Sequence, residues 1–156
     1  MQYPWLKLFL SLGLVMGLGV LGSLFTTPEI GGWYATLKKP SFNPPNSIFA
    51  PVWSTLYGLM GVSLFLVWKQ PASALRNTAL WFFAWQFAFN FCWSIIFFRL
   101  HAIGWALVEI VLLWLLILAT IVVFIKVSRV AAILLVPYLA WVSFAAVLTA
   151  FIWRLN

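Results

Sequence analysis

The chain has almost no acidic residues and few charges of any kind. Only two of its 156 residues are Asp or Glu, against nine Lys and Arg, and charged residues make up 7% of the sequence. A water-soluble domain needs a charged or polar face, which this composition does not supply. With 65% hydrophobic residues and a mean hydropathy of +1.09, the chain is predicted to be an integral membrane protein.

Cysteine and histidine are each present only once, as Cys92 and His101. A single cysteine excludes an intramolecular disulfide and a Cys-rich metal site, and its position in an apolar run predicts an inert, packed thiol. His101 lies in a short loop, where it is either a solvated side chain or a haem ligand, and no second ligand stands at metal-site spacing. The sequence also has no Ser-His-Asp set, paired carboxylates or glycine-rich phosphate loop, so it indicates no enzyme class and no required cofactor.

Five apolar runs are each long enough to cross a bilayer, which takes about 20 residues in a helix. No pattern recurs at a fixed period, and the connections after the second, third and fourth runs are short, so neighbouring helices must be antiparallel. The only long loop runs from Thr26 to Asn46. The sequence predicts an all-α membrane protein, a five-transmembrane-helix bundle forming a single domain over residues 1–156, with spans at Pro4–Phe25, Ser47–Trp68, Ala74–Phe98, Ile103–Ile125 and Arg129–Trp153.

The nine basic residues stand almost entirely at the ends of these runs. This is where Lys and Arg anchor lipid headgroups, so the bilayer rather than nucleic acid is the predicted partner. The split between the two membrane sides is too even to orient the protein. One side has Lys7, Lys69, Arg76, Lys126 and Arg129, and the other has Lys38, Lys39, Arg99 and Arg154.

Polar side chains within the third run share one helix face. Gln86, Asn90 and Trp93 are spaced i, i+4 and i+7. Such groups either hydrogen-bond to one another and to neighbouring helices, or orient a ligand in an apolar pocket. Glu109, the only acidic residue within a span, is predicted to hydrogen-bond between helices rather than to relay protons.

Aromatic stripes occur on two further runs. Trp53 and Tyr57 lie one turn apart in the second run, and Tyr138, Trp141 and Ala145 share a face of the fifth. One such stripe is explained by packing alone. Stripes on three helices equally indicate a flat aromatic pocket suited to a planar hydrophobic ligand.

Two features concern backbone geometry and helix contacts. Pro137 is predicted to kink the fifth helix because it lacks a backbone N–H. Pairs of small residues four apart let helices approach closely, either within one molecule or in a dimer. These pairs are Gly13 with Gly17 and Ala84 with Ala88.

Ordered motifs across all five runs resemble those of the TspO family of tryptophan-rich sensory proteins, whose animal members are mitochondrial translocator proteins. The long loop contains W-Y-x-x-L-x-K-P-x-F-x-P-P, beginning at Trp33. It is followed by W-x-x-L-Y from Trp53, Q-x-x-x-N-x-x-W-S from Gln86, GWALVE ending at Glu109, and PYLAW ending at Trp141.

The resemblance implies five transmembrane helices with the first loop as a lid over a cavity, a homodimer, and binding of haem, protoporphyrin and other flat hydrophobic molecules. Lys38 and Lys39 would contact porphyrin propionates, although lipid headgroups explain them nearly as well. The ligand-binding residues carried over from the family pattern are Trp33, Trp53, Tyr57, Gln86, Asn90, Trp93, Tyr138, Trp141, Phe144 and Ala145.

The chain departs from the animal pattern near its C-terminus, where Ala150 replaces the tyrosine of the cholesterol-recognition motif. The resemblance therefore favours a bacterial membrane protein that binds tetrapyrroles as a sensor or transporter. One alternative is an enzyme that degrades porphyrin with light and oxygen, using Trp33 and Trp141. The other is a regulatory or structural partner of other membrane proteins.

Overall fold

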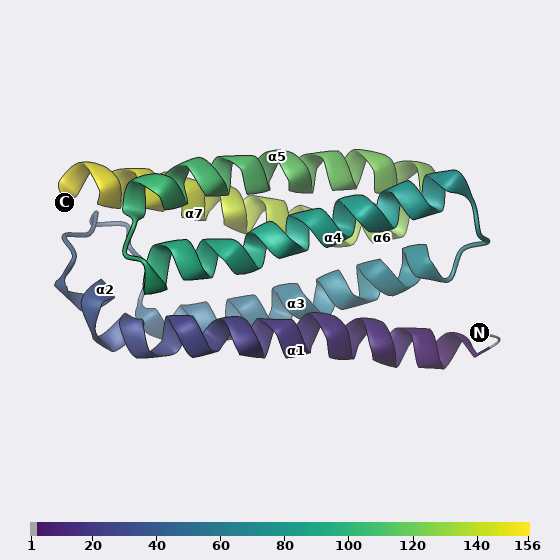
Figure 1. The fold of residues 1–156 in the computed structure, drawn as a ribbon, viewed down its shortest axis with the longest axis horizontal. Helices are drawn as coiled ribbons and strands as arrows, with labels where there is room; N and C mark the ends of the chain where they lie inside the picture. Colours follow the sequence, from purple (N-terminus) through teal and green to yellow (C-terminus); the bar gives the residue numbers. More distant parts are fainter. Residues whose placement is uncertain (1–2) are drawn as a thin grey trace.

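The computed structural model describes residues 3–156 as an elongated bundle of roughly parallel helix axes (Figure 1). Five helical spans within this range are long and apolar enough to cross a membrane, and the described residues include no strand, which confirms the predicted fold class. The elements are α1 (Pro4–Gly31), α2 (Trp33–Thr36), α3 (Asn46–Trp68), α4 (Ala74–Ser94), the π-helical turn η1 (Ile95–Arg99), α5 (Ile103–Val127), α6 (Arg129–Leu134) and α7 (Val136–Leu155).

The first helix extends beyond its predicted end at Phe25. It continues through Pro28 to Gly31, and the short helix α2 follows at once, so the irregular part of the first loop is confined to residues 37–45. The predicted loop start at Thr26 was therefore wrong. The prediction ended the helix with its apolar run, whereas the helix continues to Gly31 and Ile30 packs against the buried cluster that contains Tyr34 and Phe97.

The fifth helix is interrupted close to Pro137, in line with the predicted loss of a backbone hydrogen bond there. The fifth span is broken at Leu135, where α6 ends and α7 begins, and Pro137 occupies the first turn of α7. A proline is tolerated there because the N–H groups of a first helical turn have no partner within the helix.

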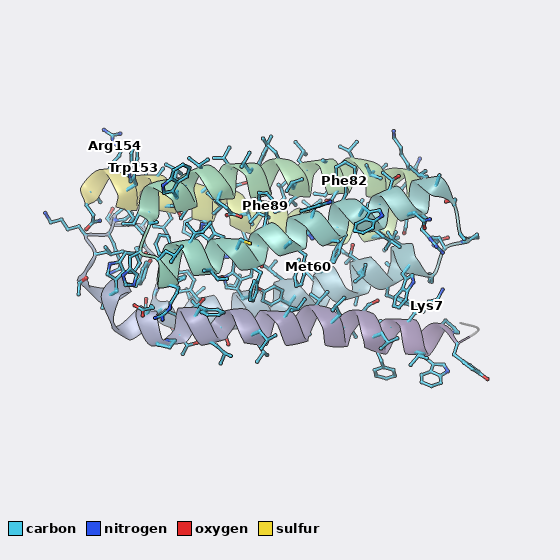
Figure 2. The ribbon with its side chains drawn as sticks, in the orientation of Figure 1. Lys7, Met60, Phe82, Phe89, Trp153 and Arg154 are labelled. Carbon is cyan, nitrogen blue, oxygen red and sulfur yellow. The ribbon has the colours of Figure 1, made fainter. Side chains whose placement is uncertain are left out.

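Glycines allow α1 and α3 to pack closely. A Cβ atom added to Gly61 would lie 3.1 Å from the Cα atom of Leu12, and one added to Gly19 would lie 2.6 Å from the Tyr57 ring. The core beside this contact contains fully buried side chains from α3, α5 and α6, including Met60, Phe124 and Ala131. Lys7 lies at one end of the bundle and Arg154 at the other (Figure 2), as expected for headgroup anchors.

The small-residue pairs lie on the outside of the bundle. Side chains added to Gly13 or Gly17 would meet nothing within 4 Å, and Ala84 and Ala88 are exposed. Cys92 is also exposed, so the prediction of a packed thiol was wrong, because α4 buries only its opposite face. These positions favour contacts outside the monomer over internal packing, and the homodimer stays a prediction.

We predict that Gly61→Ala lowers the free energy of unfolding by about 1–3 kcal/mol, the usual cost of overpacking. The added methyl must displace Leu12 and push α1 away from α3. Gly58→Ala on the same helix is the matched control, since a Cβ there meets nothing within 4 Å. Unfolding of both variants in lipid nanodiscs measures the difference, and equal stability of the two would contradict the close contact.

Candidate ligand-binding cavity

A cavity of about 380 Å³ lies among α1, α3, α4, α5 and α7, within the range of about 300–1,000 Å³ typical of small-molecule sites. Exposed residues such as Val20, Ser23 and Ser54 contribute to its wall, so it opens to the surrounding membrane along α1 and α3. Most of the predicted ligand-binding residues line it, namely Trp53, Tyr57, Asn90, Trp93, Trp141, Phe144 and Ala145.

Three predicted ligand-binding residues do not line this cavity. Gln86 and Tyr138 are fully buried behind the wall, where the Tyr138 ring lies edge-on to Trp53 with centroids 6.4 Å apart. Trp33 packs outside the cavity against Phe97 and His101. Motif matching identified the neighbourhood of each residue but not which side chains reach the cavity surface.

The contribution of α1 to the cavity was missed. Gly19, Gly22, Ser23 and Thr26 all line the wall. Their spacing of i, i+3, i+4 and i+7 marks one helix face. A stripe of small residues facing the aromatic stripes of other helices was the signal that could have identified them.

Tyr57 and Asn90 form the polar centre of the cavity wall. The Tyr57 hydroxyl donates to Asn90 Oδ1 at 3.1 Å, joining α3 to α4. Asn90 lines the cavity, so its side-chain amide can donate to a ligand there. The Tyr57 ring is held by Trp53, which stacks on it at 5.3 Å.

Aromatic rings build the walls around this pair. Trp141 packs against Phe49 and Phe144 with centroids 6.1 and 5.5 Å away. Trp93 stacks on Phe97 at 5.0 Å with the planes 16° apart. Because each ring is fixed by another in an edge-on or offset arrangement, the cavity presents flat faces that need little reorganisation to receive a planar molecule.

Several buried polar groups in the wall or behind it lack a hydrogen-bond partner among the described residues. They are the side-chain amide of Gln86, the indole N–H of Trp93, the carboxyl group of Glu109 and the hydroxyl of Tyr138. The predicted interhelical hydrogen bond of Glu109 was therefore wrong. Of the three polar groups on α4, only Asn90 hydrogen-bonds to a neighbouring helix, through Tyr57, and the three do not bond to one another. Spacing along a helix places a side chain inside the bundle but does not determine which atom it meets.

The lid, defined here as residues 33–45, is fastened by local contacts. The Tyr34 hydroxyl donates to Asn43 Oδ1 at 2.7 Å, and burial raises the pKa of Tyr34 to about 12. Lys39 Nζ lies 4.6 Å from the centre of the Tyr34 ring and donates to the Leu37 carbonyl at 3.2 Å. Phe42 packs edge-on against Phe151 of α7 with centroids 5.2 Å apart.

The other predicted polar contacts lie near the lid. Lys38 is exposed, and its backbone N–H donates to Asn156 Oδ1 at 3.0 Å. His101 does not line the cavity, and its Nε2 lies 3.2 Å from Glu29 Oε2. Contact of Lys38 and Lys39 with propionates and ligation of iron by His101 stay predictions.

We predict that Tyr57→Phe lowers the free energy of unfolding by about 1–3 kcal/mol, because Asn90 Oδ1 loses its donor while it remains buried. Tyr3→Phe is the matched control, since Tyr3 is exposed. Unfolding of the two variants in the absence of ligand measures the difference. An unchanged value for Tyr57→Phe would show that the hydrogen bond does not support the cavity.

Comparison with known proteins covers nearly the whole chain. The model of the TspO/MBR family matches residues 11–154. The tryptophan-rich protein TspO of Chlorobaculum tepidum is 43% identical over 155 residues, which cover 97% of this chain and 96% of that protein. The translocator protein of Bos taurus is 39% identical over 163 residues, which cover 100% of this chain and 94% of that protein. With its five membrane-spanning helices, the chain belongs to the TspO/MBR family of integral membrane proteins.

Proposed function

We propose that the protein binds a flat tetrapyrrole, haem or protoporphyrin, in the aromatic cavity and acts as a membrane sensor or transporter. The observation that carries this proposal is the set of fixed aromatic walls around the Tyr57–Asn90 pair. A tetrapyrrole is a broad, rigid, mainly apolar ring system, and stacking on Trp and Phe rings gives it a favourable environment. The amide of Asn90 supplies donors that orient it.

The position of the opening supports this ligand class. The wall reaches exposed positions on α1 and α3, so an apolar ligand dissolved in the bilayer has a direct route into the cavity. Propionate groups would extend toward the lid, where Lys38 is exposed. Membership of the TspO/MBR family is consistent with a sensor or transporter.

A titration of the purified protein in lipid nanodiscs with protoporphyrin or haem tests the proposal. Tryptophan fluorescence and the Soret band should change together and saturate. Trp141→Ala should weaken binding about tenfold or more, since truncating a central aromatic commonly costs above 1.4 kcal/mol. Trp105→Ala is the matched control, because Trp105 is exposed on α5 and does not line the cavity.

Two results would contradict the proposal. Quenching that rises without saturation would indicate partitioning into lipid. Equal affinities for Trp141→Ala and the wild-type protein would indicate binding elsewhere.

In the haem titration, a Soret shift abolished by His101→Ala and absent with protoporphyrin would identify His101 as an iron ligand.

Light- and oxygen-dependent degradation of porphyrin is a second candidate function. Trp141 lines the cavity and touches two other rings, whereas Trp33 packs outside it, so Trp141 is the better candidate for radical chemistry. This function predicts a defined product formed over many turnovers and lost in Trp141→Phe. Bleaching of one porphyrin per protein, equal in both proteins, would exclude catalysis.

We also propose a bacterial cell membrane as the location, supported by the identity with the Chlorobaculum tepidum protein. We propose in addition that two copies of the chain associate into a homodimer. Regulation of other membrane proteins is a weaker candidate, since the outward small-residue pairs permit such contacts without requiring them.

A further inference from the structure

Three side chains from different elements meet beside the lid. Glu29 in the last turn of α1 and His101 in the connection from η1 to α5 are in hydrogen-bonding contact, with Oε2 and Nε2 3.2 Å apart. The His101 ring also stacks on Trp33 of α2, with centroids 4.1 Å apart and planes at 16°. We call Glu29, His101 and Trp33 the latch.

The backbone of His101 has an unusual conformation that places its ring in these contacts. Within residues 3–156 it is the only non-glycine residue with a positive φ, at 53°. The position follows the end of η1, where the Leu100 N–H donates to the Ile95 carbonyl and the Ala102 N–H to the Ile96 carbonyl. A left-handed residue is common at a helix end, and histidine adopts that conformation more readily than most residues. Here the conformation directs the imidazole to Glu29 on one side and Trp33 on another.

The latch adjoins the cavity through neighbouring residues. Ile30 follows Glu29 and Tyr34 follows Trp33, and both line the cavity. The Trp33 ring also packs edge-on against Phe97, another lining residue, with centroids 5.5 Å apart. A shift of Trp33 would therefore move both the start of the lid and the wall beneath it.

We propose that Glu29 and His101 are positioning residues for the ligand site. They fix Trp33, and through it Tyr34 and the rest of the lid, so that the lid stays closed over bound ligand. This inference rests on the proposed binding of a tetrapyrrole in the cavity. It gives His101 a role in positioning the lid that requires no contact with iron.

The direct test is a double-mutant cycle with Glu29→Ala and His101→Asn, measured with protoporphyrin in nanodiscs. Protoporphyrin carries no iron, so loss of an iron ligand cannot contribute. Each single variant should raise the dissociation rate about tenfold, and the double variant should raise it no further, as expected for residues that act as one unit. Additive effects in the double variant would overturn the proposal.

The choice of variants separates the latch from a general loss of structure. Asn tolerates a positive φ better than most residues, so His101→Asn removes the imidazole while sparing the backbone. Glu29→Gln retains a hydrogen-bonding side chain and should restore part of the slow dissociation lost in Glu29→Ala. Arg154→Gln removes a charge at the same end of the bundle and should leave the rate unchanged.

Hydrogen exchange of the ligand-free protein tests the latch without any ligand. Backbone amides of residues 33–45 should exchange faster in Glu29→Ala and His101→Asn, and those of α5 should not change. Unchanged lid exchange would overturn the latch.

If wild-type protein fails to bind protoporphyrin, the proposed function fails, and this exchange measurement alone decides whether the latch holds the lid. Faster exchange with an unchanged dissociation rate would overturn the positioning role.

Discussion

The contact between Gly19 of α1 and the Tyr57 ring of α3 determines where the cavity lies. A side chain at position 19 would occupy the space of the ring, since an added Cβ would lie 2.6 Å from it. The missing side chain lets Tyr57 lie against α1 and still donate to Asn90 on α4. Three helices are thus fixed around one phenol ring, and the aromatic walls are arranged about it.

The membrane explains why polar groups in this protein indicate function. A polar atom facing hydrocarbon is costly, so polar side chains gather inside the bundle and must be satisfied there. Asn90 meets Tyr57, whereas the polar atoms of Gln86, Glu109 and Tyr138 have no partner among the described residues. Of Asn90 and these three side chains only Asn90 lines the cavity, so it is the one placed to orient a ligand there.

Composition and motif order were sufficient to predict the five spans, the interruption of the fifth helix near Pro137 and the aromatic part of the cavity wall on α3, α4 and α7. The end of α1 was not predictable from apolar length, because its last turns lie beyond the apolar run and pack through Ile30 against the cluster that contains Tyr34 and Phe97. Whether Glu109 and Gln86 meet a hydrogen-bond partner depends on the rotation of each helix by a fraction of a turn. Residue spacing along the sequence does not determine that rotation. The latch joins Glu29 to His101. Residues so far apart in the sequence leave no local pattern from which their contact could be predicted.

The most direct test of the central claim is ¹⁹F NMR of protein labelled with 5-fluorotryptophan and titrated with protoporphyrin. The resonances of Trp53, Trp93 and Trp141, assigned by single substitutions, should shift and saturate together because these rings line the cavity. Those of the exposed residues Trp81, Trp85 and Trp105 should not move. Shifts confined to the exposed tryptophans, or growing without saturation at all positions, would contradict a binding site inside the bundle.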